Sequence, residues 1–281
     1  MSKKTKTWLI IGAVLILIGG IIFTGVMTSM GWDFKKLSTN KMVTNEYTVS
    51  ETYRNISLKT VTADILFVPS DGEETRVVCY EEEKVKHTVK VEDGTLVIDV
   101  QDGRKWYNHI GFHFNTPKIT VTVPKGAYGA LTVNATTGDV KLPRDFTFAS
   151  VNVSVTTGDI MLSASATGDI TCKTTTGDVK FNGVRCANLT STGTTGDLEM
   201  KDVIATGTMN LKRSTGDVEF DACDAAELYI KVTTGDVEGT LLSEKIFHAK
   251  ATTGEVKVPQ TTSGGICEVK ATTGDIQIRI R

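Results

Sequence analysis

Acidic side chains recur at nearly equal intervals in the second half of the chain, each directly after a glycine. They are Asp139, Asp159, Asp178, Asp197, Asp217, Asp236, Glu255 and Asp275. Stacked carboxylates could bind Ca2+, a hard cation that takes oxygen ligands. The calcium-binding repeat of this general kind is a glycine-rich nonapeptide, and here only Gly168-Asp169 places an acid midway between two of these positions. We therefore favour hydrogen-bonded capping of turns by solvated carboxylates over a calcium ladder, and we expect no metal and no cofactor.

Aromatic and histidine residues form a second group, in the segment 106–114 (WYNHIGFHF). His109 and His113 would share one face of a helix, but the glycine between them and the strand-like flanks argue against a helix. A metal site would also need a third ligand, and none is evident. The segment is interpreted as an aromatic cap, or as a contact with a partner or membrane, because clustered aromatics suit interfaces. The candidate contact residues are Trp106, Tyr107 and Phe112.

The remaining reactive residues do not predict catalysis. The cysteines are odd in number and have no C-x-x-C spacing, which argues against a disulfide framework or a zinc site; Cys172 and Cys267 fall at inward positions of the repeat described next. No nucleophile–base arrangement stands out among the many Ser and Thr. The net charge is −2, and −5 without the three lysines at the N-terminus, which is no footprint for nucleic acid.

The glycines define a repeat of Thr-Thr-Gly-Asp type. Their spacings are 20, 19, 19, 20, 19, 19 and 20 residues, and a fixed period in this range is typical of stacked repeats. Glycine turns the chain sharply at little steric cost, and the following acid can accept hydrogen bonds from turn amides. We predict a structural role at each corner for Gly138, Asp139, Gly158, Asp159, Gly177, Asp178, Gly196, Asp197, Gly216, Asp217, Gly235, Asp236, Gly254, Gly274 and Asp275.

Hydrophobic residues around each glycine alternate with polar ones. Seven residues before the glycine stand Leu131, Val151 and their equivalents, and two after it stand Val140, Ile160 and theirs, whereas the position four before it is Lys in five of eight repeats. Period-two alternation predicts strands with one buried face. Glycines near the midpoint, such as Gly168, predict a second corner. The fold class is therefore all-β: a single-stranded β-helix or β-solenoid, right-handed by strand twist, with coils of about 19–20 residues.

The N-terminus predicts a membrane anchor. Lys3, Lys4 and Lys6 precede an uncharged run of twenty residues, 8–27, which is long enough to cross a bilayer as a helix. A cleaved signal peptide is the alternative, but the run is long and the following residues offer a poor cleavage site. We expect residues 1–7 in the cytoplasm, an anchor over 8–30, a linker over 31–45 and the following domain outside, since long domains translocate regardless of charge.

Residues 46–130 are predicted to form the head of the solenoid, and residues 131–281 its regular repeats. A degenerate coil lies at 55–67, where Ala63 replaces the glycine and Ile56, Leu58, Ile65 and Phe67 take the inward places. The rest of the head would cover the first end of the stack, whose strand edges would otherwise invite aggregation. At the other end, we expect the C-terminal run 276–281 to be the last strand, with Arg279 and Arg281 protecting its edge.

One apolar span, Pro124-Lys125-Gly126 leading to Leu131, and repeated Thr-Thr-Gly-Asp-Val corners resemble the bacterial putative-adhesin family of β-strand-repeat proteins, the LiaG-like proteins of unknown function. The resemblance covers nearly everything after residue 45. It implies a β-solenoid ectodomain, a setting at the cell surface or envelope, and no established catalytic residues.

We therefore expect a single-pass cell-membrane protein with an extracytoplasmic β-solenoid. Its predicted function is non-catalytic: adhesion to a surface polymer, or a scaffold in envelope-stress sensing, with the membrane and a surface polymer or envelope protein as partners. We expect neither nucleic acid nor a small-molecule substrate. The alternatives are a carbohydrate-active enzyme on a β-helix, disfavoured by the short loops, and a calcium-stabilised repeat protein.

Overall fold

A computed structural model describes residues 2–33, 41–103 and 115–281. The described residues divide into two units: residues 2–33, 41–42 and 115–116 belong to the first, and residues 43–103 and 117–281 to the second. In the first unit, the helix α1 (Lys3–Ser29) is capped by Ser2, whose hydroxyl accepts the Thr5 backbone N–H at 3.2 Å. By length and composition this helix could cross a membrane, and a signal sequence of the same kind would pass the same test.

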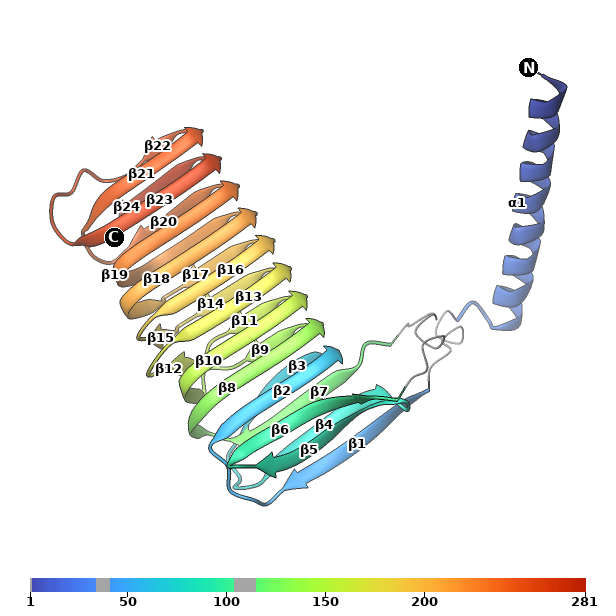
Figure 1. Ribbon diagram of the computed structural model, residues 1–281, viewed down its shortest axis with the longest axis horizontal. Helices are drawn as coiled ribbons and strands as arrows, with labels where there is room; N and C mark the ends of the chain where they lie inside the picture. Colours follow the sequence, from blue (N-terminus) through green and yellow to red (C-terminus); the bar gives the residue numbers. More distant parts are fainter. Residues whose placement is uncertain (1, 34–40, 104–114) are drawn as a thin grey trace. The chain divides into compact units, whose positions relative to one another are not determined.

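Most of the second unit is a stack of parallel strands, and from β8 to β19 the paired residues lie one repeat apart in sequence (Figure 1). Val151 pairs with Ile170, and Ile170 pairs with Leu189. One row of strands comprises β8 (Gly126–Thr137), β10 (Phe146–Thr157), β13 (Ile170–Thr176), β16 (Leu189–Thr195), β18 (Ile204–Thr215), β19 (Val218–Thr234), β23 (Gly265–Thr273) and β21 (Lys245–Thr253).

A second row follows the glycine corner. It comprises β9 (Val140–Leu142), β11 (Ile160–Leu162), β14 (Val179–Asn182), β17 (Leu198–Lys201), the start of β19, β20 (Val237–Leu241), β24 (Ile276–Ile280) and β22 (Val256–Lys257). Short strands β12 (Ser165–Ala166) and β15 (Arg185–Cys186) lie on a third side. The arrangement is mostly β and β-solenoid-like; its predicted right hand stays a prediction.

The core lies inside the stack and follows the predicted alternation. Among the strand residues seven before each glycine, all are buried except Phe247; among those two after it, all are buried except Val256, which is 38% exposed. Cys172 and Cys267 are fully buried, as expected from their inward positions. Both exceptions lie in the coil formed by β21 and β22.

The order of the last two coils corrects the sequence-based prediction. β23 lies between β19 and β21, because Cys267 pairs with both Leu228 and Phe247. β24 likewise lies between β20 and β22, so the run 276–281 does not form the end of the stack and its arginines do not protect that edge. The prediction was wrong because it assumed that coils stack in chain order.

A physical reason for this order lies in the two sets of inward side chains. The 265–280 coil offers Cys267, Val269, Ala271, Ile276 and Ile278, all at most 5% exposed. The 245–257 coil has smaller apolar groups at two of the equivalent places, Ala249 opposite Val269 and Val256 opposite Ile276. Less apolar surface at those places stays uncovered when this coil has a neighbour on one side only. Lys250 and Lys257 stand exposed on this outer coil, where charged side chains blunt an open edge.

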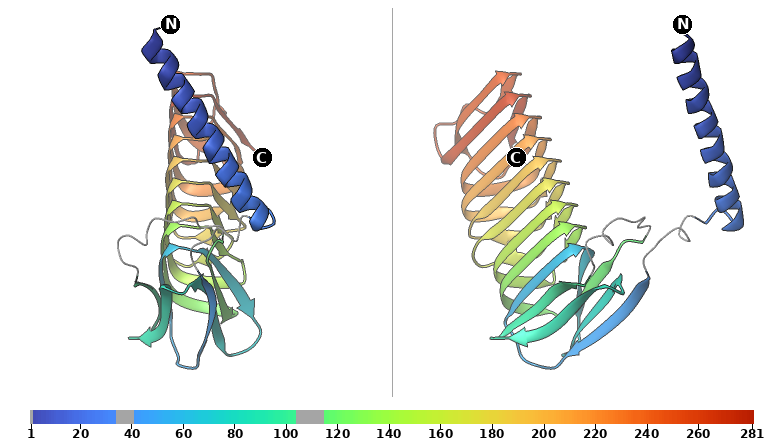
Figure 2. Two further views of the ribbon diagram at one scale, coloured as in Figure 1. Left: turned by 90° about the vertical axis from the view of Figure 1, so that its right-hand side faces the viewer. Right: turned by 45° about the vertical axis from the view of Figure 1, so that its right-hand side comes forward.

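The head continues both rows before changing direction. β2 (Asn55–Thr62) pairs with β8, and β3 (Asp64–Ser70) pairs with β9, so the coil containing Ala63 joins the stack as predicted. β6 (Thr95–Asp102) and β7 (Lys118–Pro124) add to β2 and β3 in parallel. The antiparallel strands β4 (Thr75–Glu82) and β5 (Val85–Glu92), with β1 (Met42–Val49) on β4, complete this end (Figure 2).

Candidate functional site

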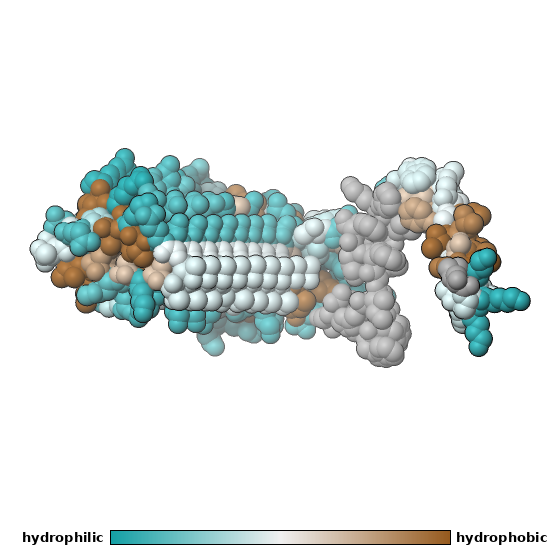
Figure 3. Space-filling model, turned by 90° about the horizontal axis from the view of Figure 1, so that it is seen from above, coloured by the Kyte–Doolittle hydropathy of each residue, from teal (hydrophilic) through white to brown (hydrophobic). Residues whose placement is uncertain are grey.

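The glycine corners form a continuous column, and the backbone there excludes any side chain. Gly196 has φ +122°, and a Cβ built on it would lie 2.3 Å from the carbonyl oxygen of Gly177 in the next coil. Only glycine both adopts this backbone conformation and tolerates this approach. Figure 3 shows pale rows of residues of near-neutral hydropathy running along the stack.

The acids after the glycines form a hydrogen-bonded ladder. In each case a carboxylate Oδ1 accepts the backbone N–H of the acid in the adjacent coil, at 2.7–3.0 Å. The ladder starts at Asp64, runs from Asp139 to Asp236 and then follows the spatial order, through Asp275 to Glu255. One oxygen of each accepting carboxylate is therefore used in capping, which supports the capping interpretation over a calcium ladder.

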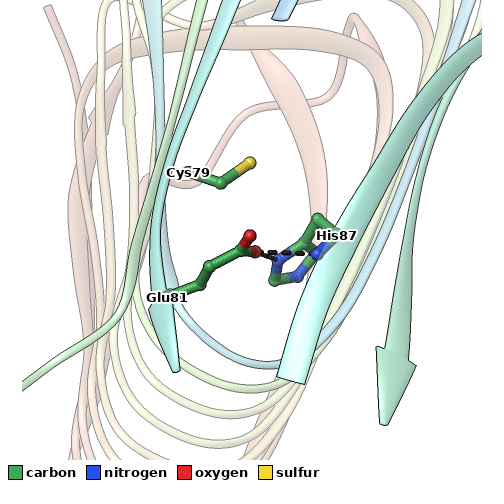
Figure 4. A group of neighbouring side chains, drawn as sticks. All are labelled: Cys79, Glu81 and His87. Atoms are coloured by element: carbon green, nitrogen blue, oxygen red, sulfur yellow. Dashed lines mark hydrogen bonds and ion pairs between the residues drawn. The ribbon is translucent and has the colours of Figure 1, made fainter. Parts of the chain in front are cut away.

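The group of side chains that most resembles a reactive centre lies inside the head. Cys79, Glu81 and His87 offer a thiol, a carboxylate and an imidazole within 4.8 Å of one another, and each is at most 2% exposed (Figure 4). Cys79 and Glu81 are on β4, and His87 is on β5. A thiolate, an imidazole and a carboxylate are ligands that Zn2+ accepts.

Hydrogen bonds occupy this cluster. Glu81 Oε2 accepts the ring Nδ1 of His87 at 2.6 Å and its backbone N–H at 2.7 Å, while Glu81 Oε1 accepts the amide of Asn45 at 2.5 Å. The His87 Nε2 lies 2.9 Å from the Thr60 hydroxyl. Burial, with Glu81 nearby, raises the pKa of Cys79 to about 12. A metal would have to break these hydrogen bonds and deprotonate that thiol. The geometry therefore fits a structural hydrogen-bond network that links β1, β2, β4 and β5 better than it fits a metal centre.

A buried cation lies inside the repeats. Arg213 is 1% exposed at an inward position, lying over Gly193, whose missing side chain leaves it room. Its guanidinium donates to Ser191 Oγ at 3.1 Å and to the Lys212 carbonyl at 2.9 Å, but the Nε atom has no partner. Burial lowers the pKa of Arg213 to about 10. Its contacts are all internal, so it cannot reach an external ligand.

The open surface offers a long groove over β11, β14, β17, β19, β20 and β24, with a volume of 690 Å3. Its lining repeats from coil to coil: Lys180, Glu199, Glu219 and Glu238 follow one another on successive strands. Lys180 Nζ and Glu199 Oε1 form an ion pair of 2.7 Å between neighbouring coils. A groove of this shape suits an extended ligand better than a small molecule.

The structure separates the predicted site residues into three groups. The corner residues come together in one column. Trp106, Tyr107 and Phe112, together with both histidines of that segment, lie outside the described residues. Sequence reasoning missed Glu81, His87 and Arg213, although strand alternation carries a signal, since each takes an inward place where an apolar residue is expected.

All five cysteines are buried and unpaired. Burial raises the pKa of Cys172 and Cys267 to about 12, and of Cys186 and Cys223 to about 11. Because the thiolate is the reactive form, these thiols are unreactive core groups.

Stacked parallel coils, a glycine and aspartate column, and an apolar N-terminal helix define a protein with a β-solenoid-like repeat domain. The sequence matches the family described as Toastrack DUF4097 over residues 53–205 and 167–281, so the chain belongs to this family. No curated protein matches the chain.

Solved structures similar to this chain come from several bacteria. A "putative adhesin" from Bacteroides fragilis is 17% identical, with a TM-score of 0.47, over 86% of this chain and 99% of its own. A "putative adhesin" from Parabacteroides merdae is 12% identical, with a TM-score of 0.46, over 86% and 98%. A "putative lipid binding protein" from Parabacteroides distasonis is 14% identical, with a TM-score of 0.44, over 86% and 98%.

Proposed function

We propose that this protein is a non-catalytic binding module tethered to the cell membrane by α1, with its repeat domain outside the cytoplasm. The observation that carries the proposal is the contrast between closed and open surfaces. The Cys79, Glu81 and His87 cluster is buried and hydrogen-bonded, whereas the 690 Å3 groove is open and repeats along the coils. Extended, repeating surfaces are what solenoid proteins use for binding.

The tether rests on the first unit. Lys3, Lys4 and Lys6 precede the apolar part of α1, and positive charge favours the cytoplasmic side. Protease treatment of intact cells tests the topology. The repeat domain should be digested from outside while the N-terminus is protected, and the full-length chain should stay in the membrane fraction. Release of a shortened, soluble chain would instead indicate a cleaved signal peptide.

Binding is tested with the full chain in nanodiscs of zwitterionic lipid, applied to an array of bacterial surface polysaccharides. Retention of the folded protein on at least one polymer, without turnover of that polymer, is the expected result. Turnover would move the proposal to a carbohydrate-active enzyme. No retention on any polymer, with the fold intact by circular dichroism, would remove the adhesive role and leave the envelope-stress scaffold.

The corner ladder belongs to the same proposal as a structural element independent of metal. Its carboxylates cap backbone N–H groups of neighbouring coils, a role that needs no ion. The melting temperature should therefore be the same in EDTA and in millimolar Ca2+. A rise with Ca2+ that is lost in EDTA would support a calcium-stabilised repeat instead.

A further inference from the structure

A row of lysines stands on the outer face of the first row of strands. Lys212 pairs in register with Lys231, Lys231 with Lys270, and Lys270 with Lys250, so four lysines occupy four adjacent strands, β18, β19, β23 and β21. Adjacent strands lie about 4.8 Å apart. We name these four residues the lysine ladder. All are exposed, and like charges at this spacing repel one another.

Three of the four ladder lysines are not paired with an acid of the described chain. Lys270 pairs with Glu268, but Lys212, Lys231 and Lys250 make no ion pair or side-chain hydrogen bond with any residue that the structure describes. On the groove side, the same fold places Lys180 opposite Glu199 in adjacent coils and joins them. Cross-coil pairing is thus available to this architecture, and the ladder does not use it.

The surface beside the ladder is shaped and partly polar. A hollow of 340 Å3 lies over β16, β18, β19 and β23. Its lining includes three ladder lysines (Lys212, Lys231 and Lys270), the Glu268 that pairs with Lys270, and Thr192, Asn210 and Tyr229. Thr192 takes the place that lysine holds in the next coils, and its short side chain leaves space. Tyr229 and Asn210 stand in the neighbouring column, in register with each other. Amide and aromatic side chains beside cations are suited to a sugar that carries acid groups.

We propose that the lysine ladder and this hollow bind a linear acidic polysaccharide lying along the stack. Carboxylates of the polymer would pair with Lys212, Lys231 and Lys250, and a sugar ring would lie against Tyr229. Two acids lie beside Tyr229: Glu227, which accepts the Tyr229 hydroxyl at 2.9 Å, and Glu268, which pairs with Lys270. The preference for an anion therefore rests on Lys212, Lys231 and Lys250, which have no acid partner among the described residues. The one-dimensional repeat of the face favours a linear polymer over a compact ligand. The inference rests on the proposed binding function, and it assigns a binding face apart from the 690 Å3 groove, together with a ligand class.

The test measures binding of the full chain in zwitterionic nanodiscs to immobilised polygalacturonate, with neutral dextran as the uncharged polymer. We expect binding to polygalacturonate alone, weakening as salt rises. The triple variant Lys212→Gln/Lys231→Gln/Lys250→Gln should lose about tenfold or more in affinity. The matched control Lys86→Gln/Lys118→Gln/Lys141→Gln removes the same charge from exposed lysines that line neither the hollow nor the groove, and it should bind as the wild type does.

Two further arms separate the alternatives. Tyr229→Ala should weaken binding to polygalacturonate but leave binding to inorganic polyphosphate unchanged, because only the sugar has a ring to stack. Equal losses in the two triple variants, equal binding to dextran, or preference for anionic lipid vesicles over polygalacturonate would each overturn the inference. Binding to other polymers on the array, unaffected by the ladder variant, would overturn it while leaving the proposed function standing.

Discussion

The repeats and the head use carboxylates in opposite ways. In the repeats, each corner acid is at least partly exposed. One oxygen of each, except the terminal Glu255, accepts a single backbone N–H from the adjacent coil, so the contribution is small and occurs many times. In the head, Glu81 is 1% exposed and accepts from His87 twice and from Asn45 once. In the head, one buried carboxylate thus accepts three hydrogen bonds, whereas in the repeats each accepting carboxylate caps one backbone N–H.

The difference follows from geometry. Stacked coils satisfy one another's backbone groups at every rung, so a corner needs only a weak cap from its neighbour. At the head, β4 and β5 run antiparallel to their neighbours, and a polar cluster ties strands whose directions differ. Losing one rung should therefore be tolerated, whereas losing the centre of the cluster should not.

The largest effect is expected from Glu81→Ala. It leaves the His87 ring, the His87 backbone N–H and the Asn45 amide without their buried acceptor, which should lower the free energy of unfolding by about 3–5 kcal/mol. Urea unfolding followed by circular dichroism measures it. Glu92→Ala is the control, since Glu92 forms an exposed pair with Lys90 and should change stability by less than about 1 kcal/mol. Equal losses in both variants would remove the distinction between buried and exposed acids.

Gly196→Val tests the corner column. The new Cβ would overlap the Gly177 carbonyl, and φ +122° is strained for valine, so the free energy of unfolding should fall by about 2–4 kcal/mol. Gly72→Val is the matched change at an exposed turn, where a Cβ meets only the Ser70 hydroxyl at 3.4 Å. A Gly196 variant as stable as the Gly72 variant would contradict the close stacking of the corners.

Arg213→Met should act in the opposite direction. The buried guanidinium forms no salt bridge with any residue that the structure describes, and its Nε has no partner. Methionine of similar length should therefore keep stability unchanged or raise it by about 1–2 kcal/mol. Thermal unfolding compares it with Arg185→Met, which removes a half-exposed pair with Asp202. A marked fall in melting temperature for Arg213→Met alone would contradict the prediction and show that the internal hydrogen bonds of Arg213 stabilise the fold.

The smallest effect is expected at a single corner acid of the hydrogen-bonded aspartate column. Asp197→Ala removes the acceptor for the Asp217 backbone N–H and should cost about 1 kcal/mol, because the N–H can turn to water at this exposed corner. Asp197→Asn keeps a carbonyl oxygen and should cost less. Chemical denaturation distinguishes them; an Asn variant as unstable as the Ala variant would show that charge matters more than the hydrogen bond.

Much of the fold could be predicted from the residues because the features that specify a stacked coil lie close together in the sequence. The period of the glycines, the alternation around Val151 or Ile160, and the substitution of Ala63 for glycine each specify an inward or outward place without reference to distant residues. The corner acids were also predictable, since a carboxylate after a glycine turn has an amide within reach. The structure adds the identity of the donor, which is a backbone N–H of the adjacent coil.

The sequence by itself determined that the chain carries an apolar N-terminal helix and coils into equivalent rungs, because period and alternation are properties of neighbours along the chain. Only the tertiary structure decided that β23 and β24 lie between earlier coils, that Glu81 meets His87, and that four lysines meet on adjacent strands. Repeats with nearly equivalent strands can stack in more than one order. The order adopted depends on how completely each coil's inward side chains are covered, and that becomes definite only when the coils are packed together.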